Sequence, residues 1–350
     1  MSESRKPSQG NLPPLRGGRL KGRPVGIVGV GSYVPERVLT NFDLERMVDT
    51  SDEWIRERTG IRERRIALDE QATSDLAVEA ALRALKDAGV KPEELDLVVV
   101  ATVSPDMLFP ATACLVQDRI GAKNAFAFDL EAGCTSFVCA LTYAATAIAS
   151  GVHETALVIG ADALSKITDW TDRTTCILFA DGAGAVVLRP CEEGYGVLSA
   201  YLRADGSGWD HAFVPAGGSR RPASEETVRN REHFIKMHGR EVFKFAVNAM
   251  AEAIETSCQL VGISVDQVKL FVPHQANYRI IAASARKLHI PEERFVINLE
   301  RYGNTSAASI PIALDEAVKG GRVERGDYIV LVAFGAGLTW GANVIRWAKG

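Results

Sequence analysis

The chain has 350 residues, 47% hydrophobic and 24% charged, which is the composition of a folded globular protein rather than of a disordered or fibrous one. No apolar run reaches the ~18 residues that a membrane-spanning helix needs, and the N-terminus lacks the apolar core of a signal peptide. The net charge of −4 argues against a general nucleic-acid binder.

The first 24 residues are basic and rich in Ser, Gly and Pro. They hold six Lys or Arg against one Glu, a local charge of +5, so the remaining residues sum to −9. Because this stretch has no hydrophobic periodicity, we predict a disordered tail over residues 1–24. Its Pro and Gly also interrupt the amphipathic helix that a transit peptide forms.

The six cysteines lie at positions 114, 134, 139, 176, 191 and 258. This scatter contains no CxxC pair and does not form the disulfide framework of a secreted protein. We therefore expect free thiols in a cytoplasmic protein, and no zinc site.

From residue 25 onward, short apolar runs alternate with helical patterns, which is typical of an α/β fold. Strands are predicted at 25–30, 97–101, 156–160, 176–179, 185–188, 270–272 and 328–333. A helix is predicted at 73–88, capped by Thr73 or Ser74 and ended by Gly89.

Two stretches of the chain resemble each other. Residues 88–99 and 261–272 each read as a helix end, a Gly, a short turn and a buried strand. Gly-Ala-Gly also occurs at both 182–184 and 335–337, before apolar runs. We therefore predict duplicated halves, 25–190 and 191–350, which could form one site between them.

Cys134 has the most informative surroundings. The residues that follow it are small and apolar up to position 149, which predicts a buried helix. Cys134 would lie at the N-terminus of this helix, where free backbone N–H groups and the helix dipole favour a thiolate. A thiolate is a nucleophile for acyl transfer, whereas the other five cysteines fit a core role.

Two later segments place polar side chains near the ends of apolar runs. PHQAN at 273–277 follows a buried strand, and ligands gather at the carboxyl ends of strands in α/β sheets. Taken alone, His274 would more often be a structural histidine. Asn304 lies in GNTS at 303–306, where it offers an uncharged hydrogen bond but alone reads as an Asx turn.

The last motif is FGAGLTWG at 334–341, a turn between strands whose backbone N–H groups could face an oxyanion. Together these segments resemble the thiolase-like condensing enzymes, and specifically the β-ketoacyl-acyl-carrier-protein synthase III family, over residues 25–350. The resemblance also rests on TSDEWI at 50–55, RTGI at 58–61, TDR at 171–173 and DGAGA at 181–185. Elongating synthases of this superfamily resemble Cys-His-His and thiolases Cys-His-Cys, whereas Cys134, His274 and Asn304 match the initiating pattern.

The resemblance implies a thiolase-like fold, with two similar α/β halves packed as a layered α-β-α-β-α sandwich. It implies an acyltransferase that condenses a short acyl-CoA with malonyl-acyl-carrier protein, through an acyl group on Cys134. His274 and Asn304 would stabilise the enolate, and the N–H groups of Cys134 and Ala336 would hold the oxyanion. Acyl-CoA is a substrate in this scheme, and no metal or other cofactor is required.

The same resemblance implies further binding residues. Trp54, Arg58 and Arg173 would border the adenine and phosphate end of CoA. Asn277 and Gly239 would line the pantetheine tunnel, and Phe243 the acyl pocket. Phe109 would reach into the pocket of a partner subunit in a homodimer. An acidic carrier protein would dock on a basic patch formed by Lys244, Arg279, Arg286 and Lys287.

The sequence departs from the family pattern at Thr135-Ser136, at Ala336 and on both sides of Gly239, which leaves pocket shape and primer choice open. One alternative is a related Cys-His-Asn ketosynthase of polyketide or secondary-metabolite starter chemistry. A second is a catalytically silent subunit of the same fold, which would be expected to lack one of the three residues. A third is a cysteine hydrolase, which would cleave acyl-CoA without malonyl-acyl-carrier protein.

Overall fold

The computed structural model describes residues 17–350 and contains two five-stranded sheets. The N-terminal sheet has the spatial order β2 (Val25–Tyr33), β8 (Asp181–Pro190), β7 (Ala156–Ala163), β5 (Leu97–Ala101) and β6 (Phe126–Leu130). The C-terminal sheet has the order β1 (Gly18–Arg19), β9 (Gly196–Ala204), β14 (Thr339–Arg346), β13 (Tyr328–Gly335) and β12 (Val268–Pro273). Pairing changes from antiparallel to parallel at β7 in the first sheet and at β13 in the second.

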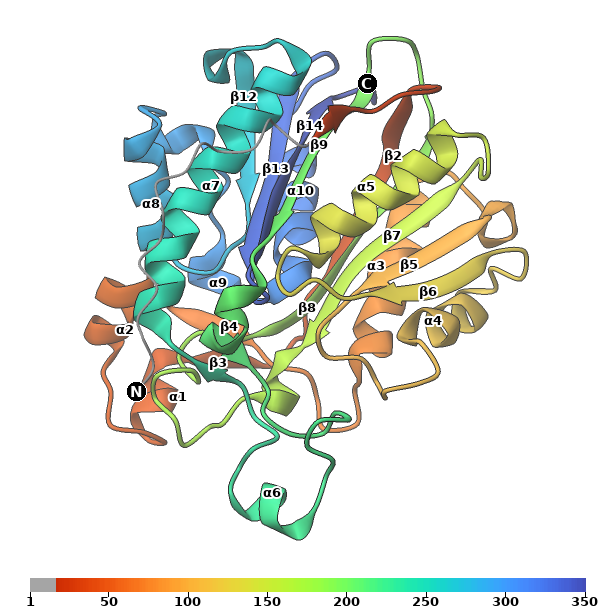
Figure 1. Cartoon of the computed structure of the whole chain (residues 1–350). Helices are drawn as coiled ribbons and strands as arrows, with labels where there is room; N and C mark the ends of the chain where they lie inside the picture. Colours follow the sequence, from red (N-terminus) through yellow and green to blue (C-terminus); the bar gives the residue numbers. More distant parts are fainter. Residues whose placement is uncertain (1–16) are drawn as a thin grey trace.

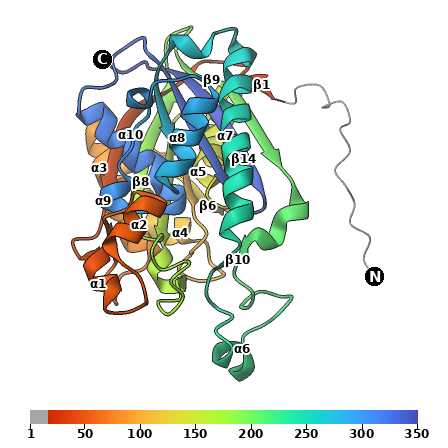
Figure 2. The same cartoon turned by 90° about the vertical axis from the view of Figure 1, so that its left-hand side faces the viewer.

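Helices fill the spaces around these sheets (Figures 1 and 2). Outside the N-terminal sheet lie α3 (Thr73–Ala88) and α4 (Thr112–Ile120), and outside the C-terminal sheet lie α7 (Gly239–Val261) and α8 (Tyr278–Lys287). Between the sheets lie α5 (Ser136–Ala149) and α10 (Ser309–Lys319). The α-β-α-β-α sandwich that we predicted is therefore confirmed.

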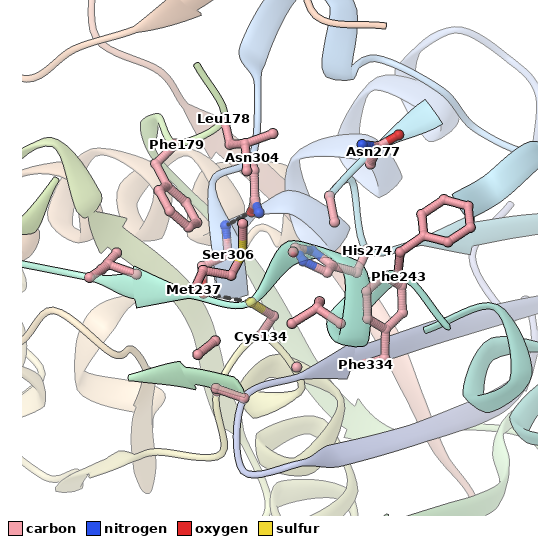
Figure 3. A pocket seen from close by; sticks show the side chains of 18 of the residues that line it. Cys134, Leu178, Phe179, Met237, Phe243, His274, Asn277, Asn304, Ser306 and Phe334 are labelled. Carbon is pink, nitrogen blue, oxygen red and sulfur yellow. Dashed lines mark hydrogen bonds between the residues drawn. The ribbon is translucent and has the colours of Figure 1, made fainter. Parts of the chain in front are cut away.

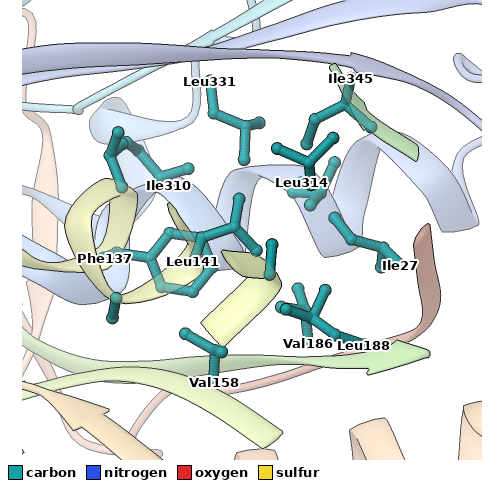
Figure 4. Close-up of a cluster of buried hydrophobic side chains, with 14 of the residues drawn as sticks. Ile27, Phe137, Leu141, Val158, Val186, Leu188, Ile310, Leu314, Leu331 and Ile345 are labelled. Carbon is teal, nitrogen blue, oxygen red and sulfur yellow. The ribbon is translucent and has the colours of Figure 1, made fainter. Parts of the chain in front are cut away.

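The central layer joins the two halves through one hydrophobic core (Figure 4). Leu141 of α5 and Leu314 of α10 pack there with side chains from both sheets, such as Val186 and Leu331. Burying each such side chain contributes about 1.5–3 kcal/mol. The sides of α5 and α10 that meet the sheets are apolar, which suits both helices to this buried position.

Short helices and strands lie in the connections between the elements of the two sheets. They are β3 (Val38–Thr40), α1 (Asn41–Glu45), α2 (Asp52–Thr59), β4 (Glu63–Arg65), β10 (Ala212–Phe213), α6 (Glu225–Arg229), β11 (Lys236–Met237) and α9 (Leu299–Tyr302). The segment that carries α6 projects from the body at the bottom of Figure 1.

The first sequence repeat has the same structure in both halves. Helices α3 and α7 end at Gly89 and Gly262, which have positive φ angles of 64° and 79°, and each is followed by a 3-10 turn and a parallel strand. The second repeat is not structural, because Gly182–Gly184 lies inside β8 whereas 335–337 forms the turn between β13 and β14.

Most predicted elements are present, and two details were wrong. Residues 176–179 form turns rather than a strand, because the Ile177 carbonyl accepts from Arg64 and Phe179 pairs only as an isolated bridge with Asn304. Helix α3 has the predicted bounds, but the carboxylate of Asp75 accepts from Ala72 N at 2.7 Å in place of a Thr or Ser cap.

The predicted tail is wrong for residues 17–24, and residues 1–16 lie outside the described residues. Strand β1 pairs with β9, and Arg23 Nε donates to Ile148 O at 2.7 Å, at the C-terminal end of α5. A guanidinium at a helix C-terminus stabilises the helix through its free carbonyls. From Gly17 to the C-terminus, no helix is both long and apolar enough to cross a bilayer.

Candidate active site

A pocket of about 990 Å³ collects residues from both halves of the molecule (Figure 3). Cys134 lies there with His274 and Asn304, which are 140 or more positions away in the sequence. Ala336 also lines the pocket, from the turn after β13. The structure therefore brings together the catalytic residues and the oxyanion residue predicted from sequence.

Cys134 precedes α5 and is fixed against the turn between β13 and β14. A Cβ atom at Gly335 would lie 2.4 Å from Cys134 N, so this close approach requires glycine. Thr339 Oγ1 donates to Ala132 O at 2.8 Å, and Thr135 Oγ1 donates to Thr339 O at 3.2 Å. Thr135, one of the departures from the family pattern, thus helps to hold the two segments together.

The thiol of Cys134 is buried, and its surroundings act on its pKa in both directions. Burial raises the pKa of the Cys134 thiol to about 12, and the carboxylates of Asp162 and Glu131 raise it further, against a hydrogen bond from Ser306 Oγ at 3.5 Å. Burial therefore opposes the predicted thiolate, whereas the helix terminus and the Ser306 hydroxyl favour it, and the thiolate stays a prediction.

His274 follows β12 and is neutral. Its backbone N donates to Val332 O at 2.8 Å, which fixes it to the neighbouring strand, and its ring lies edge-on to Phe334 with centroids 5.3 Å apart. Burial lowers the pKa of His274 to about 3. The Nδ1 atom lies 2.7 Å from Ser309 Oγ, so Nε2 is the nitrogen left for the pocket.

The backbone and the side-chain oxygen of Asn304 are both engaged. Its backbone N donates to Leu178 O at 2.9 Å, its carbonyl accepts from Ala180 N at 2.9 Å, and its Oδ1 accepts from Ser306 N at 2.9 Å. The Asx turn expected from the sequence is therefore present, and it leaves the Nδ2 group as a donor toward the pocket.

Asp162 is a buried carboxylate behind the pocket that the sequence analysis missed. Its Oδ1 accepts from Thr102 Oγ1 at 2.9 Å and from Ser104 Oγ at 2.8 Å, and its Oδ2 accepts from Ala307 N at 3.1 Å. Burial raises the pKa of Asp162 to about 6. This residue links the end of β7 to the turn that carries Asn304.

An apolar chamber forms one side of the pocket. Its side chains come from four separate segments: Val103, Leu164 with Ile167, Phe179, and Ile235 with Met237. Phe243 lines the pocket on the opposite side, with Asn277 (Figure 3), where Arg279 stacks on its ring at 5.7 Å, and its contact with an acyl group stays a prediction. The sequence missed the chamber because its four segments meet only in the folded protein.

At the mouth, the ring of Trp54 lies between two guanidinium groups, Arg58 at 5.6 Å and Arg173 at 5.2 Å. Arg173 lies just outside the pocket lining and donates to Asp49 O at 2.7 Å. Asn277 Nδ2 donates to Arg58 O at 3.0 Å, which connects α8 to α2. Gly239 opens α7 and lines the pocket.

The four predicted docking cations lie on α7 and α8. Lys244 and Arg279 line the mouth, whereas Arg286 and Lys287 lie beyond it. Lys287 Nζ donates to Asn248 Oδ1 at 2.7 Å. The structure therefore separates the four cations into two at the mouth and two farther along α8.

Two remaining predictions concern surface exposure. Phe109 is 85% exposed and lies outside the pocket of its own chain. Cys114 is exposed, so the core role predicted for it is wrong, whereas Cys176 and Cys258 are buried. Within residues 17–350, no three His, Cys, Asp or Glu side chains group as metal ligands would.

Known proteins share this fold and sequence. The family model for 3-oxoacyl-(acyl-carrier-protein) synthase III matches residues 128–206, and the model for its C-terminal part matches residues 258–347. The chain is 56% identical over 324 residues to the β-ketoacyl-(acyl-carrier-protein) synthase III of Caldanaerobacter subterraneus subsp. tengcongensis, covering 93% of this chain and 98% of that protein.

Two solved structures extend the comparison. The crystal structure of 3-oxoacyl-(acyl-carrier-protein) synthase III from Aquifex aeolicus superposes with a TM-score of 0.85 at 49% identity, over 92% of this chain and 100% of that one. The priming β-ketosynthase of the R1128 polyketide pathway superposes with a TM-score of 0.86 at 35% identity, over 96% and 100% of the two chains.

Proposed function

The chain belongs to the 3-oxoacyl-(acyl-carrier-protein) synthase III family, and we propose that Cys134, His274 and Asn304 carry out the condensation of this family. The enzyme is an acyltransferase with the thiolase-like fold, and it catalyses the initiating condensation of fatty-acid synthesis. The observation that carries the assignment of residues is the pocket in which a thiol, a neutral imidazole and an amide meet.

In the first step, Cys134 Sγ attacks the thioester carbonyl of a short acyl-CoA. The bond from the acyl carbon to the CoA sulfur breaks, CoA leaves as the thiol with the proton that Cys134 loses, and the acyl group stays on Cys134. The N–H groups of Cys134 and Ala336, two residues that line the pocket, would hold the oxyanion.

In the second step, malonyl-acyl-carrier protein enters the acylated site. The bond to the carboxylate breaks, CO₂ leaves, and the electron pair moves into an enolate whose oxygen is held by His274 and Asn304. The enolate carbon then bonds to the acyl carbon, and Cys134 leaves as a thiolate that takes a proton from solvent. Neutral donors suit this step, because a carboxylate would repel the enolate.

The alternatives are less well supported. A hydrolase needs a histidine that accepts a proton from the thiol or from water, and burial, which lowers the pKa of His274, makes this ring a weaker base. A silent subunit would not need three buried polar side chains around one pocket. A polyketide starter synthase would use the same residues, but the chain is 35% identical to the R1128 priming ketosynthase and 56% identical to the Caldanaerobacter enzyme.

We also propose which residues bind the substrates, how the chains associate and where the enzyme is located. Trp54, Arg58 and Arg173 would take the adenine and phosphates of CoA, and the cations of α7 and α8 would meet the acidic carrier protein. Leu108 and Phe109 are 82% and 85% exposed, which supports a homodimer that covers them. The free thiols support a cytoplasmic location, and the scheme invokes no metal or cofactor.

The test is to trap the acyl group on the enzyme. With radiolabelled acetyl-CoA, the wild-type enzyme should retain label on the Cys134 peptide, Cys134→Ser should lose at least about 99% of it, and Cys139→Ser, a matched change in α5, should label normally. Added malonyl-acyl-carrier protein should then move the label into β-ketoacyl-acyl-carrier protein. Equal labelling of Cys134→Ser, or release of free acetate alone, would contradict the assignment.

A further inference from the structure

The guanidinium of Arg64 is buried close to the candidate active site, and within the described part of the chain its hydrogen bonds all reach neutral acceptors. Arg64 lies in β4 and is 0% exposed. Its Nη1 donates to Leu39 O at 3.1 Å, and both terminal nitrogens donate to Asn41 Oδ1 at 2.9 Å. Its Nη2 also donates to Ile177 O at 2.9 Å. These four bonds join β4 to two other segments of the chain.

One of the segments that accept from Arg64 also holds the backbone of Asn304. There, Leu178 O accepts from Asn304 N at 2.9 Å, and Ala180 N donates to Asn304 O at 2.9 Å. Arg64 also lies against Gly303, since a Cβ atom added to this glycine would be 3.2 Å from Arg64 Cβ. Arg64 therefore meets the turn that carries Asn304 in two ways, directly at Gly303 and through the segment that pairs with Asn304.

Packing alone does not account for an arginine at this position. Burying a charge is costly, and an apolar side chain of similar volume in its place often leaves stability unchanged or higher. Burial lowers the pKa of Arg64 to about 10, which leaves the guanidinium charged at neutral pH. An apolar side chain could not supply the planar fork of donors that holds three acceptors at once. One of these acceptors, Ile177 O, is next to the residue that accepts from Asn304 N.

We propose that Arg64 is a positioning residue that holds the amide of Asn304 in place for the enolate. Through Ile177 and Gly303 it fixes the backbone of Asn304. The hydrogen bond from Ser306 N to Oδ1 then directs Nδ2 of Asn304 toward the pocket. This inference rests on the function proposed above and concerns its second step, because other groups hold the oxyanion of the first step. Loss of the fork should therefore slow the second half-reaction more than the first.

The first test separates the half-reactions in Arg64→Lys, which keeps the charge but replaces the fork by a compact ammonium. Acetyl transfer from radiolabelled acetyl-CoA to Cys134 should change less than about threefold. CO₂ release from malonyl-acyl-carrier protein by the pre-acetylated enzyme should fall about 10- to 30-fold, with the loss in kcat rather than in KM. Arg64→Met, which removes the buried charge together with its hydrogen bonds, should show the same inequality and serves if Arg64→Lys does not fold.

Arg294→Lys is the matched control for a general loss of stability. Arg294 is also partly buried, and its Nη2 donates to the backbone carbonyls of Val265, Asp266 and Val268, but it does not line the pocket. This variant should lower the urea concentration at the midpoint of unfolding. It should leave both half-reactions within about twofold of the wild type, because none of its partners pairs with a residue of the site.

The second test asks whether Arg64 acts through Asn304. Asn304→Ala alone should lower CO₂ release by about 10²- to 10³-fold, and radiolabelled malonyl-acyl-carrier protein keeps the residual rate measurable. In this background, Arg64→Lys should lower the rate by less than about a further twofold, since no amide is left to position. If Arg64 and Asn304 acted independently, the two losses would multiply.

The outcomes distinguish the role of Arg64 from the proposed function. Equal losses in both half-reactions, a loss no larger than that of Arg294→Lys, or losses that multiply in the double variant would overturn the role of Arg64. The proposed function would survive these results as long as the wild type acetylates Cys134 and Asn304→Ala loses CO₂ release. If the wild-type enzyme neither acetylates Cys134 nor releases CO₂, the proposed function itself fails.

Discussion

The two halves of the molecule share a helix, a turn and a parallel strand, but different side chains follow the strand in each half. At the carboxyl end of β5, Thr102 and Ser104 donate to the buried carboxylate of Asp162. At the carboxyl end of β12, the corresponding parallel strand, His274 points into the pocket. One strand end therefore holds the structure together, while the other supplies chemistry.

The halves also differ in the groups that they contribute, although burial acts on both in the same way. The N-terminal half supplies a thiol whose pKa is raised to about 12, and the C-terminal half a histidine whose pKa is lowered to about 3. Burial thereby favours the neutral form of each group, because a buried site disfavours either charge. The comparison teaches that burial disfavours a thiolate–imidazolium pair at this site.

The largest expected effect on the reaction rate comes from truncating a side chain to alanine at the end of β12, compared with the same change at the end of β5. His274→Ala should lower the rate of β-ketoacyl formation by about 10³-fold, since it removes a donor to the enolate. Thr102→Ala should lower the free energy of unfolding by about 1–3 kcal/mol, because a buried hydrogen bond is lost, and should keep turnover within tenfold. Initial rates and urea unfolding measure the two effects. A Thr102→Ala enzyme that is stable but as inactive as His274→Ala would break the comparison.

A smaller effect on the rates of the two half-reactions is expected from adding a methyl group at the close backbone contacts between the halves. A Cβ atom at Gly335 would lie 2.4 Å from Cys134 N, and one at Gly160 would lie 2.2 Å from Ala307 O. We expect Gly335→Ala to slow acetylation of Cys134 more than CO₂ release, and Gly160→Ala to do the reverse, each by about 10- to 100-fold. Gly218→Ala is the control, since no atom lies within 4 Å of its added Cβ. Parallel losses in both steps would mean that the two contacts are not specific to one half-reaction.

The smallest expected effect is the pH dependence of the reactivity of Cys134, which tests how far the pKa of this thiol is raised. Below its pKa, a thiol gains about tenfold in thiolate for each unit of pH, so alkylation of Cys134 by iodoacetamide should rise about tenfold per unit from pH 7 to pH 9. The rate is read by mass spectrometry of the Cys134 peptide in a Cys114→Ser background, which removes the exposed thiol. A plateau below pH 8 would show instead that the start of α5 lowers the pKa, as the sequence alone predicted.

Local sequence patterns were sufficient for many elements. The apolar run after Cys134 predicted a buried helix, and Gly89 predicted the end of α3, because helix burial and a left-handed terminal glycine depend on neighbouring residues. The strand predicted at 176–179 was wrong because its neighbouring residues alone do not distinguish a strand from a buried turn. Four apolar residues are compatible with any buried segment, and here Asn304 fixes them as a turn.

The three residues that we propose as catalytic could be singled out because each ends or begins a recognisable element and because their combination resembles one family. Their supporting residues were not. Asp162 lies inside a strand that otherwise reads as apolar, and Ser309 is one of several serines near Asn304. Nothing in the local sequence marks either one, since their partners, Ala307 and His274, come from other parts of the chain.

The sequence by itself determined most of the α/β elements, and it predicted Cys134, His274 and Asn304 as the reacting group and its partners. Only the tertiary structure decided their burial, the walls of the apolar chamber, and the anchoring of residues 17–24. The physical reason is that element formation follows from neighbouring residues, whereas hydration and hydrogen bonding at a site depend on segments that meet only when the two halves pack together.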